Sequence, residues 1–155
     1  MIALALLAAA SPAACALLTG AEIAAVQGEK PTDAKPGASE QGPLRVSSCV
    51  FVLPTFANSV SLEVSRSAGG ETRRRWKQQF HSGEQGEKEP GEDKPAPQRV
   101  PSLGDEAFWL PEKPSGALYV LRKTTLLRLS LGGPDPRHDK VARARALMKK
   151  ALRRL

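Results

Sequence analysis

The sequence predicts an α+β fold: a single antiparallel sheet of about five strands with helices packed on it. Two groups of β-branched or leucine-rich runs are separated by a stretch with helical spacing. A helix start signal precedes the first group, and a long amphipathic stretch follows the second. The predicted order is therefore α-β-β-α-β-β-β-α, in one domain.

The chain opens on a short apolar run, residues 2–10, which is followed by Ser, Pro and two Ala. Such a run is too short to span a bilayer, and small residues behind it suit signal peptidase. We therefore expect residues 1–14 to be a signal peptide and 15–155 to form the domain. Ordinary cleavage is favoured over lipid attachment at Cys15, because Pro12 stands where a lipobox expects Leu. The alternative is that the apolar run forms a buried core helix.

Cys15 and Cys49 are the only cysteines. An even number of cysteines in an exported chain is most simply explained by a disulfide. Two alternatives stay open: lipidation of Cys15, which leaves Cys49 without a partner, and two free buried thiols. No second cysteine or histidine lies at ligand spacing from either residue, so no metal site is predicted.

A short helix is predicted over residues 20–27. Thr19 and Glu22 form a capping box, in which each side chain binds the other residue's backbone N–H, and Gly28 supplies the C-terminal stop. Residues 29–43 are rich in Pro, Gly, Lys and Glu, and we expect them to form a loop.

Two strands are predicted next, over residues 46–53 and 59–66. The first is a mostly apolar, β-branched run that contains Cys49, and the second alternates between apolar and polar residues. Residues 54–58 between them have turn composition, so the two strands are expected to pair antiparallel.

A second helix is predicted over residues 71–82. Trp76 and Phe80 are four residues apart and share one face, which is typical of core residues. Residues 84–97 are acidic and Pro-rich, with Ala96 as their only apolar residue. We expect that segment to be a disordered loop inside the domain.

Three further strands are predicted over residues 103–110, 117–121 and 126–131, the last ending at a Gly-Gly-Pro turn. From residue 140 to 155, apolar residues recur at helical spacing. This final segment is therefore predicted to be an amphipathic helix.

The final helix carries the charge of the chain. Residues 137–155 contain eight basic residues and one acidic residue, a net of +7, which is also the net charge of the whole protein. The predicted basic face consists of Lys140, Arg143, Arg145, Lys149, Lys150, Arg153 and Arg154. The predicted docking face contains Leu147, Met148, Ala151 and Leu152. Because the apolar face has no Trp or Phe, docking on the sheet is favoured over membrane insertion.

The sequence contains no serine elbow, phosphate loop, dinucleotide fingerprint or zinc-binding helix motif. His81 ends a helix and His138 lies in a polar turn, so both are expected to be exposed to solvent. Asp105 and Glu106 are neighbours on a predicted strand and point to opposite faces, which excludes an acid/base pair. We therefore expect no enzyme activity, no cofactor and no metal.

Several short motifs carry a resemblance to known proteins. They are the start Cys15-Ala-Leu-Leu-Thr19, a strand that contains Cys49, and the run Gly-Asp-Glu-Ala-Phe-Trp at 104–109. Along nearly the whole mature chain the sequence resembles a group of uncharacterised exported bacterial proteins and lipoproteins. These proteins commonly open with a cysteine before Leu-Leu-Thr and carry a partner cysteine in the first strand. The resemblance implies a disulfide between Cys15 and Cys49, and no particular activity.

The sequence thus predicts an exported, non-catalytic envelope protein, a binding or sensor-like module whose partner is a small ligand or another envelope protein. The alternative is a surface-acting protein whose basic C-terminal helix binds anionic membrane or polyanion. Nucleic acid is not expected as a partner, because the exposed aromatics needed for base stacking are missing near that helix. The expected location is the periplasm or the medium, with a membrane anchor only if Cys15 is lipidated.

Overall fold

A computed structural model describes residues 12–82, 96–113 and 115–155. The signal peptide predicted over 1–14 and the loop predicted over 84–97 therefore fall almost wholly outside the described residues. The strands are β1 (Asp33–Gln41), β2 (Leu44–Val52), β3 (Val60–Arg66), β4 (Gln98–Arg99), β5 (Glu106–Leu110), β6 (Ala117–Arg122) and β7 (Thr125–Leu131). The helices are α1 (Gly20–Gln27), α2 (Glu71–Phe80) and α3 (Arg137–Arg153), with short 3-10 turns η1 (Ala14–Ala16) and η2 (Phe56–Asn58).

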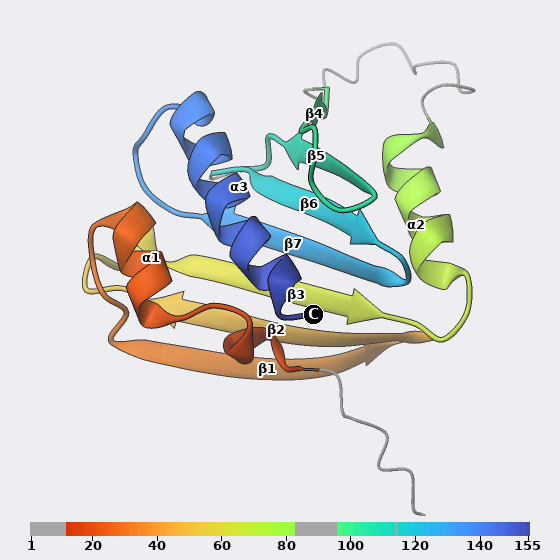
Figure 1. The fold of residues 1–155 in the computed structure, drawn as a ribbon, viewed down its shortest axis with the longest axis horizontal. Helices are drawn as coiled ribbons and strands as arrows, with labels where there is room; N and C mark the ends of the chain where they lie inside the picture. Colours follow the sequence, from red (N-terminus) through yellow and green to blue (C-terminus); the bar gives the residue numbers. More distant parts are fainter. Residues whose placement is uncertain (1–11, 83–95, 114) are drawn as a thin grey trace, which may run out of the picture.

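Among the described residues, seven strands form one antiparallel sheet in the order β1-β2-β3-β7-β6-β5-β4 (Figure 1). Strands β1 to β3 form a meander. After α2 the chain continues through β4, β5 and β6 to β7, which pairs with β3. The predicted α+β class and single antiparallel sheet are confirmed. The expected number of about five strands was too low by two.

The first helix follows from its capping signals. The Thr19 Oγ1 accepts from the Glu22 N–H at 3.2 Å, and Glu22 Oε2 accepts from the Thr19 N–H at 2.9 Å. Gly28 ends the helix with a left-handed φ of 78°, a conformation that costs glycine little. The predicted bounds of α1 are confirmed.

The loop expected over residues 29–43 is wrong, because it contains β1. Every residue of β1 is exposed, so no apolar pattern marks the strand. It is held by backbone pairing with β2 across a tight turn, in which Gly42 has a φ of 59°. The other missed strand, β4, is two residues long and pairs only with β5. Backbone pairing of such segments leaves little trace in a hydropathy pattern.

The main core lies between the sheet and the layer formed by η1, α1 and α3, which cover one face in Figure 1. Leu62, Leu129, Leu118 and Trp109 follow one another in register across β3, β7, β6 and β5, and all are buried. Successive side chains of a strand point to opposite faces, so the alternating residues of these strands supply a continuous apolar surface to the helices.

The other face carries α2. Trp76 is only 2% exposed, and its ring lies 4.4 Å from that of Phe80, which stacks in turn on Phe108 at 4.8 Å. Phe108 alternates with the buried Trp109 along β5, so this aromatic cluster lies on the face opposite to α1 and α3. Trp76 is therefore a core residue as predicted, and Phe80 is partly buried against it. Helices cover both faces of the sheet.

We predict that Gly104→Ala lowers the free energy of unfolding by about 1–3 kcal/mol. Gly104 has a φ of 59°, and a Cβ placed there lies 2.6 Å from Val120 Cγ1 and 2.7 Å from the Leu121 carbonyl oxygen. Gly69→Ala is the matched control, since a Cβ at that position meets nothing within 4 Å. Urea denaturation of both variants measures the difference, and equal effects would contradict the prediction.

Candidate functional site

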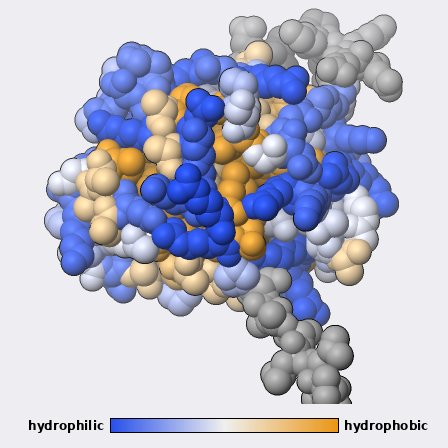
Figure 2. Space-filling view, in the orientation of Figure 1, coloured by the Kyte–Doolittle hydropathy of each residue, from blue (hydrophilic) through white to orange (hydrophobic). Residues whose placement is uncertain are grey.

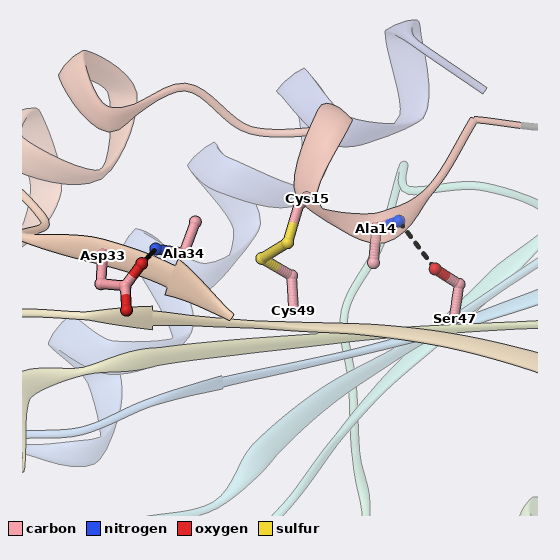
Figure 3. Close-up of a disulfide and its surroundings, with 6 residues drawn as sticks. All are labelled: Ala14, Cys15, Asp33, Ala34, Ser47 and Cys49. Atoms are coloured by element: carbon pink, nitrogen blue, oxygen red, sulfur yellow. Dashed lines mark hydrogen bonds between the residues drawn. A yellow bond between two sulfur atoms is a disulfide. The ribbon is translucent and has the colours of Figure 1, made fainter. Parts of the chain in front are cut away.

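A disulfide fixes the N-terminal segment to the sheet (Figure 3). Cys15 in η1 and Cys49 in β2 form an S–S bond of 2.03 Å, with Cα atoms 5.0 Å apart and Cys49 fully buried. Nearby, the Ala14 N–H donates to Ser47 Oγ at 2.9 Å. The predicted disulfide is confirmed. Because both sulfur atoms are bonded to each other, the structure has neither free thiols nor a Cys15 sulfur available for lipid attachment.

Beside this anchor lies an open hollow of about 1060 Å³, at the end of the sheet where β1 turns into β2 and β3 leaves for α2. Its polar lining is Ser39, Glu40, Arg45, Ser47, Arg66 and Ser67. We call this feature the arginine hollow. It lies on strands that the disulfide and the sheet hold in place, so its shape is largely preformed.

Arg45 and Arg66 are direct register partners on β2 and β3. Arg45 shares the parity of Ser47 and Cys49 along its strand, so its side chain lies on the face covered by η1. Arg66 Nη2 donates to the Pro12 carbonyl oxygen at 3.2 Å. Burial lowers the pKa of Arg66, since it disfavours the charged form.

The apolar face of α3 is docked as predicted: Leu147, Met148, Ala151 and Leu152 are all buried. The prediction that Lys140 lies on the water-facing side of the helix is wrong, because Lys140 is only 8% exposed. It lines a small hollow of about 210 Å³ together with Trp109 and Pro111. A long aliphatic stem allows a lysine to pack against such a surface.

The predicted basic face is narrower than the sequence indicates. Arg143 forms an ion pair with Asp135 at 2.5 Å. Arg154 donates hydrogen bonds to both carboxylate oxygens of Glu22, at 2.6 and 2.8 Å. Arg145 donates to the Pro101 carbonyl oxygen at 3.2 Å. The exposed remainder is Lys149, Lys150 and Arg153. Hydrophilic side chains spread over the outer surface of this helix, with hydrophobic ones showing between them (Figure 2).

We predict a pH-dependent contribution of the Glu22–Arg154 pair. The hydrogen bond from Arg154 lowers the pKa of the Glu22 carboxyl from 4.5 to about 2. The folded state therefore binds fewer protons than the unfolded state between these values. The stabilisation is complete above the unfolded pKa and is lost as the pH falls towards 2.

Glu22→Gln keeps a side chain that can complete the capping box but removes the charge. The wild type should melt at a higher temperature than this variant at about pH 6, and the gap should close towards about pH 2. Thermal melts at both pH values measure the gap. A gap that stays constant would show that the ion pair does not cause it.

On the opposite face of the sheet, Arg128 organises a polar network that the sequence did not reveal. Arg128 Nε donates to the Tyr119 hydroxyl at 3.0 Å, and its Nη2 lies 2.5 Å from Glu112 Oε2. Tyr119 also donates to Glu112, and Glu63 approaches Arg128 at 3.6 Å. Burial, followed by the bond to Glu112, raises the pKa of Tyr119. Because every charge is partnered, this network stabilises the sheet face and presents no reactive group.

The two histidines, both expected to be exposed to solvent, differ in their surroundings. His138 is 82% exposed at its side chain, as predicted. His81 is less exposed than expected: 33% of its side chain is exposed, its Nε2 lies 2.6 Å from Glu106 Oε1, and its ring lies edge-on to Phe108. Asp105 binds elsewhere, accepting from the Lys123 N–H and from Arg73 at 2.8 Å each.

Within residues 12–82, 96–113 and 115–155, no group of three or more His, Cys, Asp or Glu side chains is placed to hold a metal ion. In the same described ranges no helix is both long and apolar enough to cross a membrane. Comparison of the chain with protein-family models, curated proteins and solved structures finds no match.

Proposed function

We propose that this chain is an exported, non-catalytic binding protein of the bacterial envelope, and that the arginine hollow is its ligand site. The observation that carries the proposal is the hollow itself, about 1060 Å³ in volume and lined by two arginines and three serines. Ligand sites are concave, preformed and furnished with a few convergent polar groups. The hollow combines these properties.

Export is supported by the chemistry of the two cysteines. A buried disulfide persists in an oxidising compartment and is rare in a reducing cytosol. The bond between Cys15 and Cys49 also lies just behind the residues expected to be cleaved as a signal peptide. The segment that follows the cleavage point is thus fixed to the sheet after export.

The hydrogen-bonding side chains that line the hollow favour binding over catalysis. Arginine side chains donate hydrogen bonds and stay charged at physiological pH, so they orient a ligand and do not shuttle protons. Ser47 Oγ already accepts from the Ala14 N–H, and Ser67 Oγ lies 2.7 Å from Thr72 Oγ1. Neither hydroxyl is bonded to a histidine, which a serine nucleophile of the usual kind requires.

The basic helix supports the alternative function less well. Its apolar residues form part of the main core, so inserting α3 into a lipid surface would expose that core. Three of its arginines are held by other parts of the protein. The charges left to attract a polyanion are Arg137 at its start and Lys149, Lys150 and Arg153 near its end, and surface charges of that kind contribute little individually.

Ligand binding is tested by titrating the isotopically labelled protein with neutral, cationic and anionic small solutes and following backbone amide shifts. We expect perturbations to cluster around the arginine hollow. Ala38→Trp should fill the hollow and remove them, because Ala38 lines it. Ala34→Trp is the matched control, on the same strand and face but about 13 Å away. Perturbations that are absent, or that survive Ala38→Trp, would overturn the binding site.

Export is tested separately, by expressing the full chain in a bacterium and measuring the mass and thiol content of the product in each fraction. We expect a shortened chain without free thiols in the periplasm. An intact chain in the cytoplasm with two free thiols would overturn the export proposal.

A further inference from the structure

We propose that the arginine hollow binds its ligand through a phosphate or carboxylate group held between the guanidinium groups of Arg45 and Arg66. This inference rests on the proposed function and names the chemistry of its ligand. It is carried by the cross-strand placement of the two arginines and by the partners that each of them has in the protein.

The register places two positive charges side by side. Arg45 and Arg66 are paired Cα partners in neighbouring antiparallel strands. Directly opposed side chains on one face have Cβ atoms about 4.5–5.5 Å apart, and like charges in that position destabilise a sheet. Both guanidinium groups stay charged at any physiological pH. An anion between them would convert the repulsion into two attractive contacts.

Several other arginines among the described residues have carboxylate partners. Arg73 pairs with Asp105, Arg128 with Glu112, Arg143 with Asp135 and Arg154 with Glu22. Among the described residues no carboxylate forms an ion pair with Arg45 or Arg66.

In the uncleaved chain Arg66 instead donates to one carbonyl oxygen, that of Pro12 in the expected signal peptide, and its partial burial removes water that would solvate the charge. Glu40 is the register partner of Arg45 on β1 and lines the hollow. One carboxylate facing two guanidinium groups leaves the hollow with an excess of positive charge. That excess favours an anionic ligand.

The geometry suits an oxyanion. A guanidinium presents parallel N–H donors that match two oxygens of a carboxylate or phosphate, and such charge-assisted pairs are the strong ones among hydrogen bonds. The hollow, at about 1060 Å³, is much larger than one such group. The ligand is therefore an organic molecule whose anionic group is anchored at the arginines, while the remainder lies along Ala38, Ser39 and Ala68.

The test measures the melting temperature of the full chain in chloride, inorganic phosphate or citrate at constant ionic strength. We expect phosphate or citrate to raise it, and the larger response identifies a phosphate or a carboxylate as the preferred group. Arg45→Gln should raise the melting temperature in chloride, because it removes the repulsion, and should abolish the response to the anion. Arg45→Lys should keep the lower melting temperature and weaken the response, because it keeps the charge without the paired donors.

Arg153→Gln is the control, since Arg153 is exposed on α3 and lies outside the hollow. It should change neither the melting temperature in chloride nor the response to anions. An anion response that survives Arg45→Gln, or a lower melting temperature of that variant in chloride, would overturn the inference.

Failure of the inference is distinguishable from failure of the proposed function. If neutral or cationic solutes perturb the amides of the hollow while phosphate and citrate do not, the hollow binds a ligand but not an anion. If no solute perturbs them, the proposed ligand site itself is wrong.

Discussion

Leu147→Asp is expected to lower the free energy of unfolding by about 3–5 kcal/mol, because it places an unpaired charge in the main core. Leu147 is 1% exposed and belongs to the core between α3 and the sheet. A carboxylate there is surrounded by apolar side chains and loses its water. Chemical denaturation of the variant and the wild type measures the change.

Lys150→Glu and Arg153→Glu are the matched surface changes on the same helix. Both residues are exposed, so each substitution should change the free energy of unfolding by no more than about 0.5 kcal/mol. Arg154 does not serve as such a control, because it is bound to Glu22. Comparing the core variant with the two surface variants separates the effect of disrupting the docked face from the effect of changing the charge of the helix.

The membrane alternative expects the opposite pattern. In that case Leu147→Asp would leave the denaturation curve unchanged and abolish co-sedimentation with anionic vesicles, while Lys150→Glu would weaken sedimentation in a salt-dependent way. Strong sedimentation of the wild type at physiological salt, together with an unchanged curve for Leu147→Asp, would overturn the docked role of α3.

Elements with local signals were predictable from the sequence. The bounds of α1 follow from the reciprocal bonds of Thr19 and Glu22 and from the left-handed Gly28, all of which act within one short segment. The docking face of α3 follows from apolar spacing alone. By contrast, Lys140 lies on the polar side of that pattern and is buried all the same, because tertiary packing covers its stem.

Elements stabilised by long-range pairing were not predictable in this way. β1 buries none of its side chains, contains Pro36 and Gly37, and owes its conformation to the neighbouring strand. The sequence also does not indicate which side of the sheet each helix covers, since an apolar stripe on α2 does not specify the face on which the helix packs.

The candidate site could be predicted from the sequence only in part. The disulfide followed from counting cysteines, but neither Arg45 nor Arg66 was singled out as a functional residue. A signal was present: Arg45 precedes Pro54 by nine residues and Arg66 follows Asn58 by eight, so a hairpin about the predicted turn brings the two together. Using that signal requires the register of the hairpin, and a slip of one residue would move either side chain to the other face.

Removing the disulfide is expected to lower the free energy of unfolding by about 3–4 kcal/mol, the loop-closure entropy for a bridge of this span. Cys15 and Cys49 are separated by 34 positions. A double variant, Cys15→Ala with Cys49→Ala, avoids placing a hydroxyl where Cys49 is fully buried. Urea denaturation of this variant and of the oxidised wild type measures the loss.

Adding a reductant should lower the stability of the wild type towards that of the double variant and leave the double variant unchanged. In the uncleaved chain, reduction should also loosen one wall of the hollow, because the disulfide holds η1 where the Ala14 N–H donates to Ser47 and the Pro12 carbonyl oxygen accepts from Arg66. Faster hydrogen exchange at the Ala14 amide after reduction would report this release. If reduction changes neither stability nor exchange, the bond does not fix the N-terminal segment, and the hollow does not depend on an oxidising compartment for its shape.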